Sequence, residues 1–378
     1  MKFGLFYEMS VPVQYRDLGQ YSEKEMYGAL LHQVQLAEKL GFHIVWLPEH
    51  HYNLDYSHIS APDVTLMHLA AHTKTIHLGP AVVVIPIHHP VMVAERYATL
   101  DLLSNGRLEL GVGRGAFSGW LDVFAPGKVS SLAETRGIFF EGLEVIRKAW
   151  TQEWFTHEGT YFPIKEPINV IPKPLQKPHP PIHAPCTGAD SLDVYPKVGL
   201  NAQSVTWAKP LIDIEGEVKR FRVAWAAGQK EGNNLATRKE GEFSCLINVY
   251  CGSDRKKAFQ EAKPYWEWWQ SRLKEFYTAD RIKRQGGRVP YGSAAYYDLS
   301  FEACVEQGMV CAGTPDDCYD YISKLNAYGV DTTFAQFQIG PMPFETASRS
   351  IELFGTQVMP HFTGRTTTSS VGGSRGQR

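Results

Sequence analysis

Four short segments, each directly after an apolar run, contain the residues best suited to chemistry. They are Glu49-His50-His51, His88-His89, Gly113-Arg114-Gly115 and Thr187-Gly188. Imidazole exchanges protons near neutral pH, arginine keeps a permanent charge, and glycine lets the backbone approach a ligand closely. These residue types suit an enzyme that transfers a proton beside a bound phosphate group.

The adjacent histidines His50 and His51 point in different directions, because neighbouring side chains on an extended chain diverge by about half a turn. We expect one of them to face the site and the other to be structural. No metal site is expected at these histidines or at His88 and His89. Zinc sites use at least three convergent protein ligands, and the sequence has neither an H-x-H pair nor an acidic residue beside His88-His89.

Two segments are candidates for binding a phosphate. The glycine-rich segment 111–115 departs from the dinucleotide-binding fingerprint, and a tight exit from a strand explains its glycines equally well. Thr187, Gly188 and Ser191 precede a helix, whose unsatisfied N–H groups and dipole attract anions, although an ordinary helix cap has the same composition. We expect Arg114 and this helix start together to hold one phosphate.

The elements that position these segments alternate along the chain. Short apolar runs are followed by longer amphipathic ones, which is typical of successive βα units and a parallel sheet. We expect a (β/α)8 TIM barrel with loop insertions, whose reacting groups lie at the C-terminal ends of the strands. The expected strands are 2–7, 43–47, 76–85, 108–112, 182–184, 202–205, 243–250 and 332–338. The expected helices are 23–40, 62–72, 91–103, 132–150, 190–198, 211–227, 253–277, 314–327 and 344–358.

Three segments fall outside this alternation. Residues 154–162 are typical of a hairpin that turns at Glu158-Gly159, and residues 279–300 form an insertion placed to close over the site as a lid. The tail, residues 363–378, is rich in Thr, Ser, Gly and Arg, and we expect it to be disordered. We expect residues 1–362 to form one domain.

Composition limits the classes of partner. A formal net charge of -2 over 378 residues provides no basic field for nucleic acid. No apolar run approaches the roughly 18 residues of a membrane span, and the start of the chain has no signal-peptide core, so we expect a cytoplasmic protein. The six cysteines form no C-x-x-C pair, and we expect most of them to be buried apolar residues.

Several segments together resemble the bacterial luciferase-like flavin-dependent monooxygenases. The resemblance spans about residues 1–362 and is most specific in Trp46-Leu47-Pro48-Glu49-His50-His51 and in Ser104-Asn105-Gly106-Arg107. Residues 1–6, 108–115, 313–315 and 353–360 also match the family.

The resemblance implies that the barrel mouth binds FMN. His50 matches the family's general base or proton donor beside the flavin, and Arg114 matches its flavin-contacting arginine. Ala81 and Val82 match a stretch in which luciferases have a non-proline cis peptide beneath the flavin ring. Gly113 stands where luciferase itself has a cysteine, so light emission is not implied.

The phosphate loop also departs from the family. Pro185-Cys186-Thr187 replaces an acid-serine pair, and we expect Thr187, Gly188 and Ser191 to be the phosphate contacts. The residues expected to rim the substrate pocket are aromatic: Phe117, Trp120, Phe124, Tyr291, Tyr296 and Tyr297. Such an apolar rim favours an uncharged or weakly polar organic substrate, although the basic run 281–288 leaves an anionic substrate open.

The implied activity is that of the oxygenase in a two-component monooxygenase. Reduced FMN (FMNH2), supplied by a separate NAD(P)H:flavin reductase, reacts with O2 to a flavin C4a-(hydro)peroxide that hydroxylates a small organic substrate or inserts oxygen in the Baeyer–Villiger manner. Two alternatives stay open: hydride transfer with a deazaflavin, and a non-catalytic flavin-binding subunit of a heterodimer. Relatives pair through helices near the second and third strands, so we expect a homodimer.

Overall fold

The computed structural model describes residues 1–13, 22–53, 55–115, 118–125, 134–276 and 294–364. Most of the predicted insertion and of the predicted tail lies outside these described residues. Two predicted pocket residues, Phe117 and Tyr291, also lie outside them.

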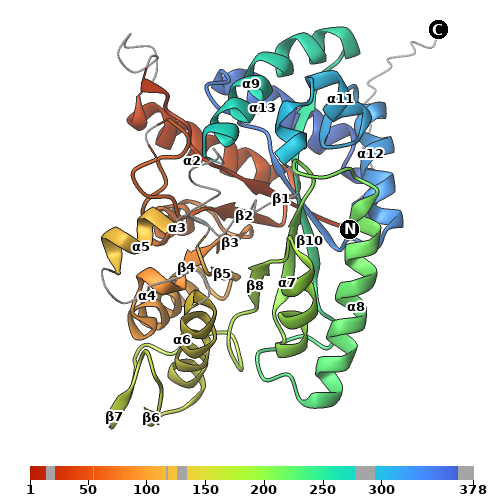
Figure 1. Cartoon of the computed structure of the whole chain (residues 1–378). Helices are drawn as coiled ribbons and strands as arrows, with labels where there is room; N and C mark the ends of the chain where they lie inside the picture. Colours follow the sequence, from red (N-terminus) through yellow and green to blue (C-terminus); the bar gives the residue numbers. More distant parts are fainter. Residues whose placement is uncertain (14–21, 54, 116–117, 126–133, 277–293, 365–378) are drawn as a thin grey trace, which may run out of the picture.

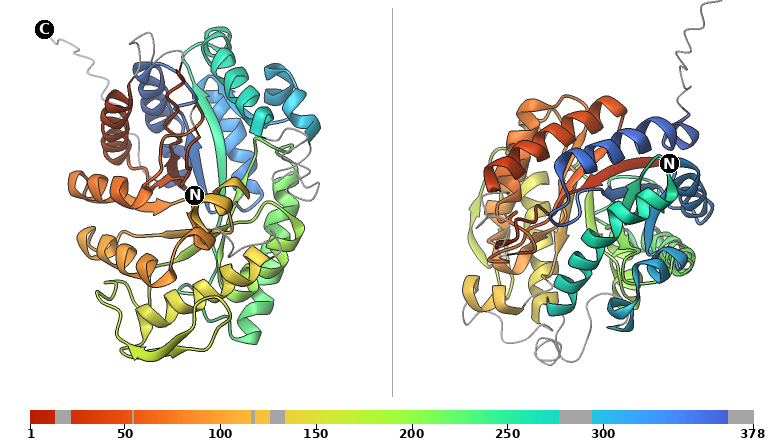
Figure 2. Two further views of the ribbon diagram at one scale, coloured as in Figure 1. Left: turned by 60° about the vertical axis from the view of Figure 1, so that its left-hand side comes forward. Right: turned by 90° about the horizontal axis from the view of Figure 1, so that it is seen from above.

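Ten strands form one sheet, and eight of them close into a parallel barrel (Figures 1 and 2). The order around the barrel is β3-β2-β1-β12-β10-β9-β8-β5. A parallel bridge between Leu78 of β3 and Leu108, just before β5, closes the ring. The predicted (β/α)8 barrel is therefore confirmed. The barrel strands are β1 (Lys2–Phe6), β2 (Ile44–Leu47), β3 (His77–Pro80), β5 (Leu110–Gly113), β8 (Ile182–Pro185), β9 (Asn201–Val205), β10 (Phe243–Cys251) and β12 (Thr332–Gln336).

Helices surround the strands (Figure 2). The first of them begins at Ser22, which forms a reciprocal capping box with Glu25, and ends at Gly41 with a φ of 89°, a left-handed conformation that glycine adopts without steric cost. The helices are α2 (Glu23–Leu40), α3 (Pro62–His72), α4 (Pro90–Leu103), α5 (Ser118–Phe124), α6 (Glu134–Thr151), α7 (Ala189–Val194), α8 (Asp213–Glu231), α9 (Arg255–Phe276), α11 (Phe301–Glu306), α12 (Pro315–Ala327), α13 (Phe344–Gln357) and α14 (Pro360–Thr363).

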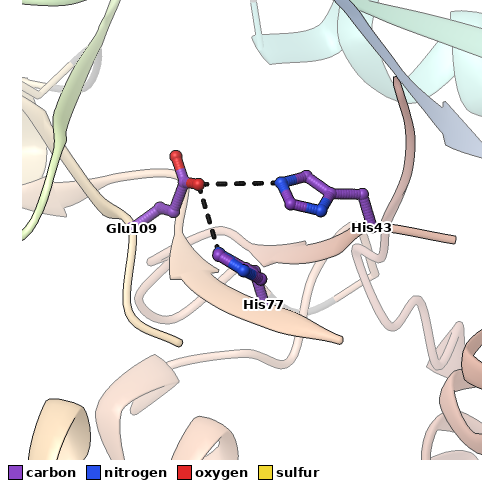
Figure 3. A group of neighbouring side chains, drawn as sticks. All are labelled: His43, His77 and Glu109. Atoms are coloured by element: carbon purple, nitrogen blue, oxygen red, sulfur yellow. Dashed lines mark ion pairs between the residues drawn. The ribbon is translucent and has the colours of Figure 1, made fainter. Parts of the chain in front are cut away.

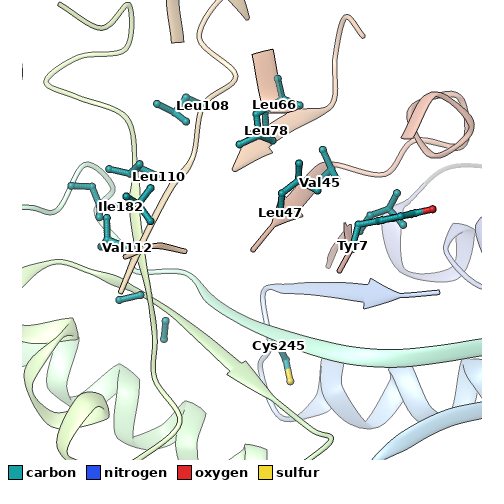
Figure 4. Packing of buried hydrophobic residues seen from close by; sticks show 14 of the residues in the cluster. Tyr7, Val45, Leu47, Leu66, Leu78, Leu108, Leu110, Val112, Ile182 and Cys245 are labelled. Atoms are coloured by element: carbon teal, nitrogen blue, oxygen red, sulfur yellow. The ribbon is translucent and has the colours of Figure 1, made fainter. Parts of the chain in front are cut away.

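Alternate side chains of β2 enter two different apolar clusters. Val45 of β2 packs with helix residues such as Leu66 of α3 in the larger cluster (Figure 4), whereas Trp46 of the same strand joins a second cluster with Phe334. This alternation follows from the two-residue period of a strand. Gly79 makes room for the indole, because a Cβ there would lie 2.2 Å from the Trp46 ring.

The third predicted strand, residues 76–85, is interrupted in the structure. β3 ends at Pro80, the peptide bond between Ala81 and Val82 is cis, and only the two-residue strand β4 (Val83–Val84) follows. A 3-10 helix (Ile85–Ile87) then leads into α4. A continuous apolar sequence does not show such a break, because the residues on both sides of it are buried.

The strand β11 (Val310–Gly313) was not predicted from the sequence. This strand pairs with the second half of β10, from Asn248 to Cys251, on the side where β9 has already ended. Glycines at both ends and Pro315 suggested an interruption, and they conceal a four-residue run that is buried throughout. β10 therefore has neighbours along its whole length.

Other departures are local. The predicted hairpin is present as β6 (Phe155–His157) and β7 (Ile164–Ile168), with the second strand beginning later than expected. The predicted helix 190–198 is divided into α7 and a 3-10 turn (Pro196–Val198), since Pro196 lacks the N–H that would continue the helix. All six cysteines are buried and form no disulfide. Among the described residues, no helix has the length and apolar character needed to cross a bilayer.

Candidate active site

Two adjoining cavities lie at the C-terminal ends of the barrel strands. The inner cavity has a volume of about 100 Å³ and the outer cavity one of about 260 Å³. His50, Ala81, Pro185 and Thr187 line both, so the cavities meet at these residues. The structure thus brings together three predicted site residues, His50, Ala81 and Thr187, that follow three different strands.

His50 lies at the junction of the two cavities. Its ring packs against Tyr56 and Trp120, with centroid separations of 5.5 and 5.6 Å. Burial lowers the pKa of His50 from 6.5 to about 3, and the neighbouring His51 adds to this lowering. The imidazole is therefore neutral at physiological pH, whereas the sequence analysis assumed an ordinary pKa.

Glu49 is a site residue to which the sequence analysis gave no role. Its carboxylate accepts hydrogen bonds from the backbone N–H of Val84 at 2.7 Å, and its other oxygen lies 3.1 Å from His51 Nε2 and 2.5 Å from His88 Nε2. Burial alone would raise the pKa of Glu49, but His51, His88 and Val84 N–H lower it to about 2. The ionised carboxylate therefore connects the loop after β2, through the hydrogen bond from Val84 N–H, to the segment that follows the cis peptide.

The outer cavity has a wall of closely approaching backbone. Val82 of the cis peptide lies beside Gly113, where an added Cβ would come within 2.4 Å of the Val82 side chain. A Cβ at Gly111 would lie 2.1 Å from the carbonyl oxygen of Pro80. The glycines of β5 are thus required by packing against residues 80–82, and the cis peptide is present where the resemblance implied it.

A positive charge lies at the other end of the outer cavity. Arg114, directly after β5, lines this cavity and is exposed. The half-buried Ser191 and the buried Tyr195, in the segment after β8, line it as well. Burial raises the pKa of Tyr195, and the nearby Arg114 opposes this effect. Tyr195 was not predicted, because its position at the end of a six-residue helix carries no chemical signature.

The remaining predicted site residues differ in their placement. Trp120 lines the outer cavity and donates its indole N–H to the carbonyl oxygen of His51 at 3.0 Å. Gly188 lines neither cavity within the described part of the chain, and its carbonyl oxygen accepts the hydroxyl proton of Ser191 at 2.8 Å. Gly188 therefore orients Ser191.

Glu8, which follows β1, is a buried carboxylate that the sequence did not single out. It lines the inner cavity and is 4% exposed. One oxygen accepts the hydroxyl of Tyr56 at 2.5 Å, and the other accepts Trp269 Nε1 at 2.9 Å and Gln336 Nε2 at 3.3 Å. Burial raises the pKa of Glu8 to about 7 in spite of these three donors.

A second polar cluster lies at the opposite, N-terminal end of the strands. His43, His77 and Glu109 place their ligand-type atoms within 4.8 Å of one another, a spacing compatible with a metal ion (Figure 3). The carboxylate is already occupied, however: Arg238 lies 2.9 Å from one oxygen and His183 2.6 Å from the other. A cation there would lie beside a guanidinium, so the cluster is better described as an ion-pair network that joins strand ends.

The fold and this site define a class of barrel enzyme whose reacting groups meet at the C-terminal strand ends. The model of the luciferase-like monooxygenase family matches residues 1–332, and the chain belongs to this family. It is 26% identical over 368 residues to the oxygenase component of the flavin-dependent trigonelline monooxygenase of Acinetobacter baylyi, an alignment that covers 96% of each chain.

Solved structures share the whole fold. The monooxygenase RslO1 of Streptomyces bottropensis matches with a TM-score of 0.79 and 25% identity, over 96% of this chain and all of that one. The oxygenating constituent of 3,6-diketocamphane monooxygenase from Pseudomonas putida, solved with FMN, matches with a TM-score of 0.73 and 18% identity. The match covers 95% of this chain and 98% of that one. The coenzyme F420 dependent tetrahydromethanopterin reductase of Methanopyrus kandleri matches with a TM-score of 0.66 and 22% identity. The match covers 96% of this chain and 99% of that one.

The residues of the outer cavity fit a flavin nucleotide. A planar ring system can lie against closely packed backbone, and Gly113 and the cis peptide between Ala81 and Val82 line the outer cavity together. A phosphate needs a permanent cation and hydroxyl groups, and Arg114, Thr187 and Ser191 line the same cavity. This donor set suits one phosphate group.

Proposed function

We propose that this protein is the oxygenase component of a two-component monooxygenase, which takes FMNH2 from a separate NAD(P)H:flavin reductase and uses O2 to oxidise a small organic substrate by hydroxylation or Baeyer–Villiger insertion. The observation that carries the proposal is the position of His50, buried where the outer cavity, lined by Arg114 and the cis peptide, meets the smaller inner one. The named relative that is an oxygenase component supports a separate reductase.

Each cavity has its own role in this proposal. Ala81, Val82 and Gly113 would hold the flavin ring, and Arg114 with the hydroxyls of Thr187 and Ser191 would hold its phosphate. Gly188 would act by orienting Ser191. Bound reduced flavin supplies the two electrons that activate O2.

The inner cavity would hold the substrate beside His50. A neutral imidazole has one N–H donor and one acceptor nitrogen, so His50 can hydrogen-bond to the substrate or the flavin in either direction while it stays uncharged. Trp120, packed on His50 and hydrogen-bonded to the loop, would help to keep water out of this junction. The prediction that Phe117 and Tyr291 rim the pocket concerns residues outside the described ones.

The test is to mix the purified chain with photoreduced FMN and O2 and to follow flavin reoxidation. We expect the protein to slow reoxidation relative to free FMNH2, and His50→Ala to return it toward the free rate. Arg114→Ala should weaken FMN binding at least tenfold in a fluorescence titration. The matched control is Arg349→Ala, because Arg349 is an exposed arginine on α13 that pairs with Glu261 and lines neither cavity. Reoxidation at the free-flavin rate in the wild type would contradict the proposal.

The second candidate is hydride transfer with a deazaflavin, which the likeness to the F420-dependent reductase favours. Its cofactor also has a planar ring system and a phosphate, so the outer cavity does not separate the two. Oxygen uptake does, because hydride transfer consumes no O2. A role as a non-catalytic subunit is less consistent with the chain, since His50 and Arg114 lie together at one site.

A further inference from the structure

The inner cavity contains a buried carboxylate that the proposed function does not use. Glu8 receives hydrogen bonds on both oxygens from Tyr56, Trp269 and Gln336, and all three groups act as donors. Donors on both oxygens stabilise the ionised form of a carboxylate. A neutral acid would have to turn its own proton toward one of these donors. The surroundings of Glu8 are therefore built for a negative charge.

Among the described residues, none supplies the positive charge that a buried anion requires. Two cations adjoin lining residues and are already paired: Arg272, next to Leu273, with Asp55, and Lys209, which donates to Ser204, with Glu217. His50, on the other side of Tyr56, is neutral because burial lowers its pKa to about 3. A buried charge is stable when it is paired, and otherwise it tends to be neutralised.

Aromatic rings form much of the remaining lining. Phe6, Tyr56, Trp207 and Phe334 line the cavity, and Trp207 packs edge-on against Trp269 at 5.3 Å. Aromatic faces attract organic cations through the ring quadrupole, and more strongly in desolvated sites. A carboxylate surrounded by aromatic rings is a suitable environment for a cationic nitrogen.

We propose that the substrate bound in the inner cavity carries a cationic nitrogen, in a quaternary or aromatic ammonium group, which pairs with the carboxylate of Glu8. This inference rests on the proposed function for the identity of the cavity as a substrate site, and it replaces the uncharged substrate expected from the apolar rim. Glu8 is then a specificity-determining residue, because it binds a part of the substrate that need not react.

Binding of a cation must depend on pH if the ionised form of Glu8 is required. The pKa of Glu8 is raised to about 7 by burial, so the carboxylate is largely protonated at pH 5.5 and largely ionised at pH 8.5. His50 remains neutral over this range. Linkage then predicts that affinity for a cation increases by more than about tenfold between these pH values, and affinity for a neutral molecule does not.

The experiment compares N-methylpyridinium with toluene, its neutral isostere, by calorimetric titration of the full chain with and without oxidised FMN. We expect N-methylpyridinium to bind at least tenfold more tightly at pH 8.5 than at pH 5.5, and toluene to bind equally at both. Glu8→Gln should remove the preference for the cation. Glu302→Gln, which changes an exposed carboxylate on α11, should leave it unchanged.

A further variant keeps the test decisive if Glu8→Gln does not fold. Tyr56→Phe removes one donor to Glu8 and keeps the carboxylate, so the cation preference should persist with its pH midpoint moved upward. Toluene binding as tightly as N-methylpyridinium at pH 8.5 would overturn the proposal. A cation preference that disappears when FMN is bound would overturn it as well, since Glu8 would then face the flavin. Both readouts are binding, so they stand apart from a failure of oxygenase activity.

Discussion

At the scale of single residues, the same burial has opposite outcomes for the titratable groups around the two cavities. Burial dominates for His50 and leaves it neutral. Glu49 is buried too, yet the donors converging on it hold its pKa near 2. Glu8 lies between these cases, because its three donors only partly offset the cost of burial. The number and charge of the partners therefore decide which group can exchange a proton near neutral pH.

The lowered pKa of His50 predicts how the free energy of unfolding depends on pH. A folded-state pKa of about 3 lies below the ordinary value of 6.5, so the unfolded chain binds a proton that the folded chain does not. The stability from this group is fully present above pH 6.5 and is lost as pH falls toward 3. We expect the wild type to lose about 2 kcal/mol more than His50→Gln between pH 6.5 and 4.5. Urea unfolding at each pH measures this.

The control for that experiment is His72→Gln, because His72 is exposed on α3. The free energy of unfolding of this variant should change with pH in the same way as that of the wild type. Parallel curves for the wild type and His50→Gln would show that His50 protonates equally in both states. Glu49 acts in a lower window: its depressed pKa contributes stability above pH 4.5, which is lost as pH falls through about 2.

Residue type and position after a strand were enough to single out His50 and Arg114, whereas the cis peptide at Ala81-Val82 was predicted only by the family resemblance. They were not enough for Glu8, because its role depends on residues 261 and 328 positions away, Trp269 and Gln336. Glu49 was visible beside the histidines, but its bond to Val84 N–H depends on the path of the chain after the cis peptide. Convergence over long sequence separations is the part of a site that residue patterns do not contain.

At the scale of elements, the approach of β5 to the cis peptide predicts an effect of Gly113→Ala. The added methyl group would lie 2.4 Å from the Val82 side chain and would push the two segments apart. We expect the free energy of unfolding to fall by about 1–3 kcal/mol, as for other overpacked sites, and FMN binding to weaken. Thermal unfolding and a flavin titration measure the two effects.

Two further variants test whether the effect of Gly113→Ala comes from the clash with Val82 rather than from replacing any glycine by alanine. Gly28→Ala in α2 adds a methyl group into open space and should stabilise the helix by up to about 1 kcal/mol without changing FMN binding. Val82→Ala combined with Gly113→Ala removes the atom that clashes and should restore part of both losses. An unchanged stability for Gly113→Ala alone would mean that β5 can shift freely.

The order of strands and helices was readable from the sequence because each barrel unit repeats the same burial pattern. Caps with a clear chemical reason, such as Gly41 after α2, were placed correctly. The errors occur where a strand is buried on all sides, as in β11, or where one apolar run contains a break, as between β3 and β4. In both cases hydrophobic pattern alone does not distinguish a continuous strand from an interrupted one.

At the scale of the whole molecule, an exposed apolar stripe supports the proposed homodimer. Met92, Arg96 and Leu103 are spaced along α4 so that they share one face of the helix. Met92 is 48% and Leu103 65% exposed, and Arg96 pairs with Asp63 of α3, beside the exposed Val64. These are the helices near the second and third strands, through which the resemblance implied that two chains pair.

A charge placed on this stripe should therefore separate the two chains. We expect the wild type to elute as a dimer in gel filtration with light scattering, and Leu103→Asp to shift it toward the monomer, because a dimer would have to bury the new carboxylate without a partner. The matched control is Val223→Asp on α8, where the side chain is 72% exposed on a different helix. A wild type that is monomeric at micromolar concentration would contradict the homodimer. A shift produced equally by Val223→Asp would instead place the interface on another face of the barrel.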